Sequence, residues 1–182
     1  MKVIRLLIGT AFALAGLVAS TAQASNSLTF QGVTLETLSK PGNVLELTII
    51  NANHATGNWS GVQFLEAFEI KNVGNVTGAT ITPNDMTDYN KELNNKGCTG
   101  GGGADWGCFK ASTPIALTDN MTWDITFSGI NLNFGLPHLK VEFYKKSSDT
   151  RATGDLLSMD LPVYTPPPPR RLRSPSLKPT PC

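Results

Sequence analysis

Apolar and polar residues alternate one by one along much of the chain, and this period of two constrains the fold more than any other feature. The alternation is clearest in the segments 30–36, 45–49, 122–127 and 139–143. Successive side chains of a β-strand point to opposite faces, so such segments form strands with one buried and one solvent-facing side. Their Thr, Val, Ile and aromatic content favours strands as well.

Turn signals divide these segments at short intervals, for example Pro41-Gly42-Asn43 and Pro83-Asn84-Asp85. The spacing predicts an all-β fold, an antiparallel β-sandwich of about seven to nine strands over residues 25–164. One short helix is expected over Asn84 to Leu93, where Asn84 can cap a turn or two.

The amino terminus has the three parts of a secretory signal. Lys2 and Arg5 precede an apolar run, Leu6 to Val18, and small residues follow it up to the Ala-x-Ala site Ala22-Gln23-Ala24. The run is shorter than the roughly 20 apolar residues that span a bilayer. We expect residues 1–24 to be a signal peptide, with an N-terminal anchor helix as the alternative. Export to an extracellular or cell-surface location follows, with signal peptidase as a transient partner.

Because the chain is expected to be exported, two of its three cysteines are predicted to form a disulfide. Cys98 and Cys108 are separated by nine residues, five of which are Gly. Thiols oxidise outside the cytosol, and glycines let so short a loop double back, so a Cys98–Cys108 disulfide is predicted. Cys182 is left without a predicted partner.

The composition changes after Tyr164. Residues 165–182 contain four consecutive prolines, Pro166 to Pro169, and carry four cations and no acid, which predicts a disordered tail. Residues 25–164 hold all 14 acids and only nine of the 15 cations. An acidic body of this kind argues against nucleic-acid binding. No segment after the signal is long enough to span a membrane.

Catalytic signatures are weak. His54 and His138 lie outside any metal-binding pattern, and a structural role is expected for both. No Gly-x-Ser-x-Gly elbow is present. The Gly100 to Gly103 run lacks the Lys and Ser/Thr of a phosphate-binding loop. Glu66 and Glu69 are three apart, which on a regular strand places them on opposite faces.

Calcium is the one cofactor that the residue types suggest. Oxygen ligands gather in two predicted turns, one with Asn84, Asp85 and Asp88, the other with Asp119, Asn120 and Asp124. Calcium prefers such ligands, but the EF-hand spacing is absent. No cofactor is therefore expected.

The tryptophans offer possible ligand contacts. Trp123 alternates with polar neighbours and is expected in the core, whereas Trp59 and Trp106 lie in turns. An exposed aromatic ring can stack on a sugar, or it can close over its own core edge. A carbohydrate-binding module is therefore an alternative function, and it requires Trp59 or Trp106 to be exposed.

Two segments carry a resemblance to a known family. They are the loop from Gly97 to Cys108 and the segment Pro137 to Tyr144, followed by Gly154 to Ser158. Together they resemble exported bacterial proteins of the PEP-CTERM group. The resemblance implies a β-sandwich body at the cell surface or in an extracellular matrix, sorted by an exosortase-type membrane enzyme.

The tail departs from that group. It has Pro166 to Pro169 and then Arg170-Arg171, where the sorting signal has Pro-Glu-Pro, an apolar helix and a basic cluster. The tail is either a frameshifted or degenerate sorting signal, or a genuine flexible basic segment.

The sequence thus predicts a non-enzymatic, exported surface or matrix protein, with extracellular polysaccharide or other surface proteins as partners. Two alternatives stay open. One is the carbohydrate-binding module, and the other is a secreted hydrolase that uses dispersed acids or one of the two histidines as its base.

Overall fold

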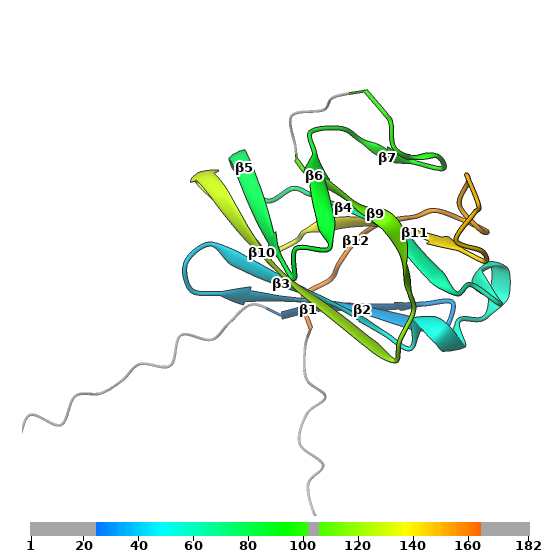
Figure 1. Cartoon of the computed structure of the whole chain (residues 1–182). Helices are drawn as coiled ribbons and strands as arrows, with labels where there is room; N and C mark the ends of the chain where they lie inside the picture. The colour runs from blue at the N-terminus through cyan, green and yellow to red at the C-terminus, as the bar shows by residue number, and fades with distance from the viewer. Residues whose placement is uncertain (1–24, 102–105, 165–182) are drawn as a thin grey trace, which may run out of the picture.

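The computed structural model describes residues 25–101 and 106–164. The predicted signal peptide, the predicted tail with Cys182, and residues 102–105 of the Gly-rich loop lie outside the described residues. The described chain is an antiparallel β-sandwich of two five-stranded sheets, with a separate two-stranded hairpin (Figure 1). Ten strands build the sandwich, slightly more than the seven to nine expected. Its all-β class and antiparallel pairing confirm the prediction.

The first sheet has the strand order β1-β2-β3-β10-β5. Its strands are β1 (Ser25–Phe30), β2 (Val33–Lys40), β3 (Val44–Ile50), β10 (Asn120–Ile130) and β5 (Asn75–Thr82). The second sheet has the order β12-β11-β4-β9-β6. Its strands are β12 (Leu157–Asp160), β11 (His138–Tyr144), β4 (Phe64–Lys71), β9 (Cys108–Ala116) and β6 (Met86–Tyr89).

The core lies between the two sheets and follows the alternation of the sequence. In β3, Leu45, Leu47 and Ile49 are fully buried, while the residues between them are only partly so. Trp123 in β10 is 2% exposed, as expected for a core residue. Removing such side chains from water is the main stabilising contribution to a fold of this kind.

The second sheet departs from simple alternation. In β4 and β11 six consecutive residues are buried, because the outer face of this sheet is covered as well as its core face. The covering element is the hairpin of β7 (Leu93–Asn94) and β8 (Gly97–Cys98). We call residues 92–98 the cover.

Two short 3₁₀ turns, η1 (Ala52–His54) and η2 (Gly57–Trp59), connect β3 to β4. The helix expected over Asn84 to Leu93 is wrong: its first half is strand β6, and its last residue belongs to β7. Met86 faces the core, and β6 pairs with β9, so ladder hydrogen bonds and burial outweigh a weak helical pattern. Within the described ranges no helix reaches the length and apolarity of a membrane span.

Candidate functional site

The outer face of the second sheet holds a layer of charged side chains beneath the cover. We call Glu66, Glu69, Lys110, Lys140 and Glu142 the charged layer. Glu69 and Glu142 are fully buried, and Glu66 and Lys140 are 5% and 8% exposed. Charged side chains are almost never this deeply buried unless they are paired, so this layer is the most unusual chemistry in the described chain.

A β-bulge places two of these acids together. The β4–β9 register shifts between Leu65 and Ala67, and Glu66 lies at that shift. Glu66 therefore turns to the same outer face as Glu69, where each meets a lysine. The expectation that Glu66 and Glu69 lie on opposite faces is wrong, because a bulge reverses the alternation locally.

Ion pairs bind the layer together. The Nζ of Lys110 lies 2.7 Å from Oε1 of Glu66, and the Nζ of Lys140 lies 3.1 Å from Oε2 of Glu69. Lys140 also donates to Oε1 of Glu92, in the cover, at 2.6 Å. Burial by itself lowers the pKa of Lys140, but the hydrogen bonds to Glu92 and Glu69 outweigh it and hold that pKa above its usual value.

The cover is tied to the layer by backbone, disulfide and packing contacts. The backbone N–H of Leu93 donates to Oε2 of Glu69 at 3.2 Å. The predicted Cys98–Cys108 disulfide is confirmed and joins the cover to β9. Both cysteines pack with Leu93 and Ala67 in a second apolar cluster, separate from the main core.

Gly97 lets the cover approach the charges closely. Its φ is +85°, and a Cβ at this position would lie 3.1 Å from the Nζ of Lys110. A side chain here would push against Lys110 and strain the backbone, so the position favours glycine.

Glu142 is the least compensated member of the layer. Both of its carboxylate oxygens are buried without a hydrogen-bond partner in the described structure. Burial first, and then repulsion from Glu66, raise the pKa of Glu142 to about 7 against the pull of Lys110. The Tyr144 hydroxyl and the Gly97 amide lower it by less, and neither reaches hydrogen-bonding geometry. Burial likewise raises the pKa of Tyr144.

His138 belongs to a second polar cluster at the edge of the same face. Its Nδ1 lies 2.8 Å from Oδ1 of Asp160, and its Nε2 lies 3.0 Å from Oγ of Ser158. The β11–β12 register sets His138 opposite Asp160 and diagonal to Ser158. These contacts follow the order of a Ser-His-Asp triad. Unlike the buried acid of such a triad, however, the Asp160 side chain is 65% exposed.

The other predicted histidine is exposed. The His54 side chain is 71% exposed, and its Nε2 lies 3.4 Å from Oδ1 of Asp119. A surface ion pair of this kind contributes little to stability and points to no chemistry.

The structure buries both tryptophans that were considered as ligand contacts. Trp59 is fully buried, donates from Nε1 to the carbonyl oxygen of Asp155 at 2.6 Å, and packs edge-on against Phe30 and Phe143. Trp106 is 8% exposed. Neither ring offers the exposed face that a sugar platform requires, so that expectation is corrected. Both rings instead close the edge of the main core.

The acids considered as candidate calcium ligands are largely engaged by other groups. Asp85 accepts a hydrogen bond from Nε1 of Trp123, and Asp124 pairs with Lys40 at 2.8 Å. Asp119 accepts from Asn53. Among the residues that the structure describes, no three His, Cys, Asp or Glu side chains lie together as a metal site would require.

Of the four acids in these two predicted turns, Asp88 is the one without such a partner in the described structure. Its Oδ1 is buried and unpartnered, and burial raises the pKa of this carboxyl to about 6. It lines a hollow between β5 and β6, together with Ala79, Thr80, Ile81, Asn84, Met86 and Thr87.

Sequence reasoning treated Lys140 and Glu142 as the wet face of a strand and did not identify the charged layer. The sequence feature that could have indicated the charged layer is the high density of acids and lysines on strands next to a disulfide-closed loop. Comparison with protein-family models, with curated proteins and with solved structures found no match.

Proposed function

We propose that this chain is an exported, non-enzymatic β-sandwich protein that serves at the cell surface or in an extracellular matrix. The observation that carries the proposal is the Cys98–Cys108 disulfide, which holds the cover over the charged layer. Disulfides form and persist in oxidising compartments, which agrees with the secretory pattern of residues 1–24.

The position of the charged layer supports a structural role for its acids. A general acid or base must come within hydrogen-bond reach of its substrate. Glu66, Glu69 and Glu142 are instead buried beneath the cover, and lysines pair with two of them. Such a layer fixes how the cover sits on the sheet, which fits a binding or scaffolding protein. The resemblance to the PEP-CTERM group supports sorting to the cell surface.

Cell fractionation with amino-terminal sequencing tests export directly. We expect the protein in the medium or on the cell surface, with Ser25 as its first residue. Replacing Ala22 and Ala24 with bulky residues removes the small side chains of the cleavage site, so the precursor should accumulate. A cytosolic protein that keeps Met1 would contradict the proposal.

The His138 cluster favours a secreted serine hydrolase as a second candidate. In that mechanism Ser158 attacks an ester carbonyl, and His138 accepts the hydroxyl proton and passes it to the departing alcohol. Against it, the cluster is open to water, which weakens the electrostatic stabilisation on which such enzymes depend.

A fluorophosphonate probe separates the two functions. The non-enzymatic proposal predicts that mass spectrometry finds no more label on the wild-type protein than on Ser158→Ala. Ser60→Ala, in the loop before β4, is a control for nonspecific serine labelling. Label on Ser158 that disappears in His138→Ala would establish the hydrolase instead.

A further inference from the structure

Within residues 25–101 and 106–164, the first sheet has one long edge without a neighbouring strand. Its other edge strand, β1, is bridged by the segment that follows β12: the N–H of Ser27 donates to Pro162 at 3.1 Å, and the N–H of Tyr164 donates to Ser25 at 2.8 Å. Among the described strands, β5, with eight residues, pairs with β10 alone. Long unprotected edges pair readily with other strands.

The backbone of β5 presents groups without a partner in the described structure at Ala79 and Ile81, whereas the N–H of Val76 donates to the carbonyl oxygen of Gly74 at 3.1 Å. The N–H of Phe127 in β10 donates to Asn43, on the β3 side, at 3.0 Å. In an antiparallel ladder the N–H and C=O of one residue point to the same side. The backbone N–H and C=O of Phe127 therefore point away from β5. Those of Ala79, which is paired with Phe127, point to the free edge of the sheet. Those of Ile81, two residues on, do the same.

The side chains of β5 carry no charge that would oppose pairing with another strand. No charged residue occurs between Lys71 and Asp85. Natural edge strands commonly use lysine, proline or short length to prevent association. The edges of the second sheet, β6 and β12, have four residues each and carry Asp88 and Asp160.

We propose that two copies of this chain pair through their β5 edges in an antiparallel, two-fold symmetric dimer. The argument rests on self-complementarity. A bulge at Thr77 interrupts the β5–β10 register, so Val76, Ala79 and Ile81 all pack toward the core. Counting the bulge residues Thr77 and Gly78 as one ladder position, a two-fold axis at Ala79 sets Ile81 opposite the partner's Val76 and Thr80 opposite the partner's Thr77. Apolar residues meet apolar residues on one face, and threonines meet on the other.

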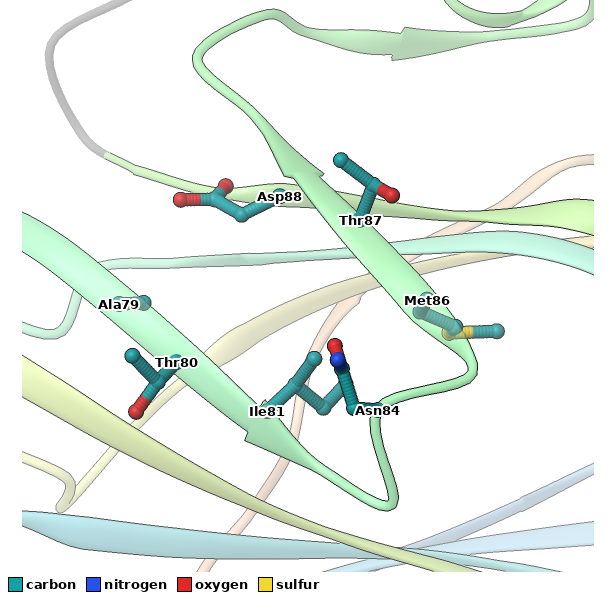
Figure 2. Close-up of a pocket in the computed structure, with 7 residues that line it drawn as sticks. All are labelled: Ala79, Thr80, Ile81, Asn84, Met86, Thr87 and Asp88. Atoms are coloured by element: carbon teal, nitrogen blue, oxygen red, sulfur yellow. The ribbon is translucent and has the colours of Figure 1, made fainter.

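A hollow beside this edge leaves room for the partner strand. It has a volume of about 350 Å³ and lies between β5 and β6. Figure 2 shows the two strands diverging from their connecting turn, with Ile81 and Asn84 near the turn and Asp88 toward the open end. The inward apolar side chains of a partner β5 would lie over this hollow, next to Ile81 and Met86.

The geometry closes the assembly at two copies. Head-to-tail growth would need β5 of one copy to pair with β1 of the next, but β1 is already bridged by residues 162–164. When two β5 edges pair with each other, both are covered, and no other free edge of this length is left among the described strands.

Sedimentation velocity on the mature full-length chain tests the proposal, over concentrations up to about 1 mM. We expect a concentration-dependent dimer. Thr77→Lys with Thr80→Lys places like charges opposite each other twice and should weaken dimerisation at least about 10-fold. Thr77→Lys with Thr80→Glu places opposite charges there and should restore it.

The matched control adds the same two charges away from the edge. Thr48→Lys with Thr122→Lys modifies facing residues on the central strands β3 and β10, and should leave the dimer intact. Circular dichroism checks that each variant folds. A monomer at every concentration, a wild-type dimer that survives both lysines at Thr77 and Thr80, or larger assemblies would overturn the proposal.

Discussion

The stability of the folded chain is expected to fall as the pH rises from about 5 to about 7.5, and Glu142 is the main cause above pH 6. Its pKa is about 7 in the folded protein against 4.5 for the unperturbed group. The folded state therefore binds this proton more tightly than the unfolded state does, so the stabilisation is complete below pH 4.5 and is lost through pH 7. A shift of this size corresponds to at most about 3 kcal/mol.

Glu142→Gln isolates this contribution. The amide does not titrate, and it removes the repulsion between Glu142 and Glu66. We expect chemical denaturation at pH 8 to show a gain of about 2 kcal/mol in the free energy of unfolding. At pH 5 the variant and the wild type should differ little.

The comparison of Glu142→Gln with the wild type needs a control variant and has to allow for the contribution of Asp88 to the pH dependence. Glu36→Gln removes an acid from the exposed face of β2 and should leave the pH dependence unchanged. Asp88, whose pKa is about 6, contributes a slope of the same sign below pH 6 in every variant. Equal pH profiles for Glu142→Gln and the wild type would contradict this account of the charged layer.

Loss of the disulfide is the second large effect that we predict. Cys98→Ala with Cys108→Ala should lower the free energy of unfolding by about 2–3 kcal/mol, because the unfolded chain gains the entropy that the short loop withheld. The melting temperature should fall by roughly 10 °C. Denaturant titration of the oxidised wild type, the reduced wild type and the variant gives the measurement.

The structure also predicts where this loss is felt. The cover carries Leu93 and Cys98, whose cluster with Ala67 and Cys108 lies apart from the main core. Amide exchange should therefore increase most in residues 92–98 and least in β3 and β10. Unchanged exchange in the cover, or a uniform increase throughout both sheets, would show that the disulfide does not hold the cover.

The sandwich could be predicted from the sequence because a strand that is buried on one face alternates between apolar and polar residues. The alternation in 45–49 and 122–127 became β3 and the central part of β10, with Trp123 in the core as expected. The Cys98–Cys108 pairing was equally accessible, since a short glycine-rich loop allows few alternatives.

What the sequence did not predict depends on contacts between distant residues. The cover buries the outer face of β4 and β11, so Lys140 and Glu142 look like surface residues in the local pattern. A bulge sets Glu66 beside Glu69, and no local signal marks it. The contacts of His138 with Ser158 and Asp160, 20 and 22 residues further along the chain, arise from the pairing of β11 with β12.

The same limit applies to Trp59 and to the segment after Asn84. Trp59 lies in a polar turn, and only the packing of β1 and β11 around it turns its ring inward. The apolar spacing of Met86, Tyr89 and Leu93 suits a helix, but pairing with β9 makes the first part a strand. In both cases tertiary contacts outweigh local preference.

Carboxyl-carbon NMR titration of Glu142 is the most direct test of the claim that a disulfide-held cover seals a buried charged layer. In the oxidised protein we predict that this carboxyl titrates with a pKa of about 7. In the Cys98→Ala, Cys108→Ala variant, loosening of the cover admits water and should bring the pKa down toward its ordinary value. An ordinary pKa in the oxidised protein would contradict the claim, and so would a raised pKa that the variant leaves unchanged.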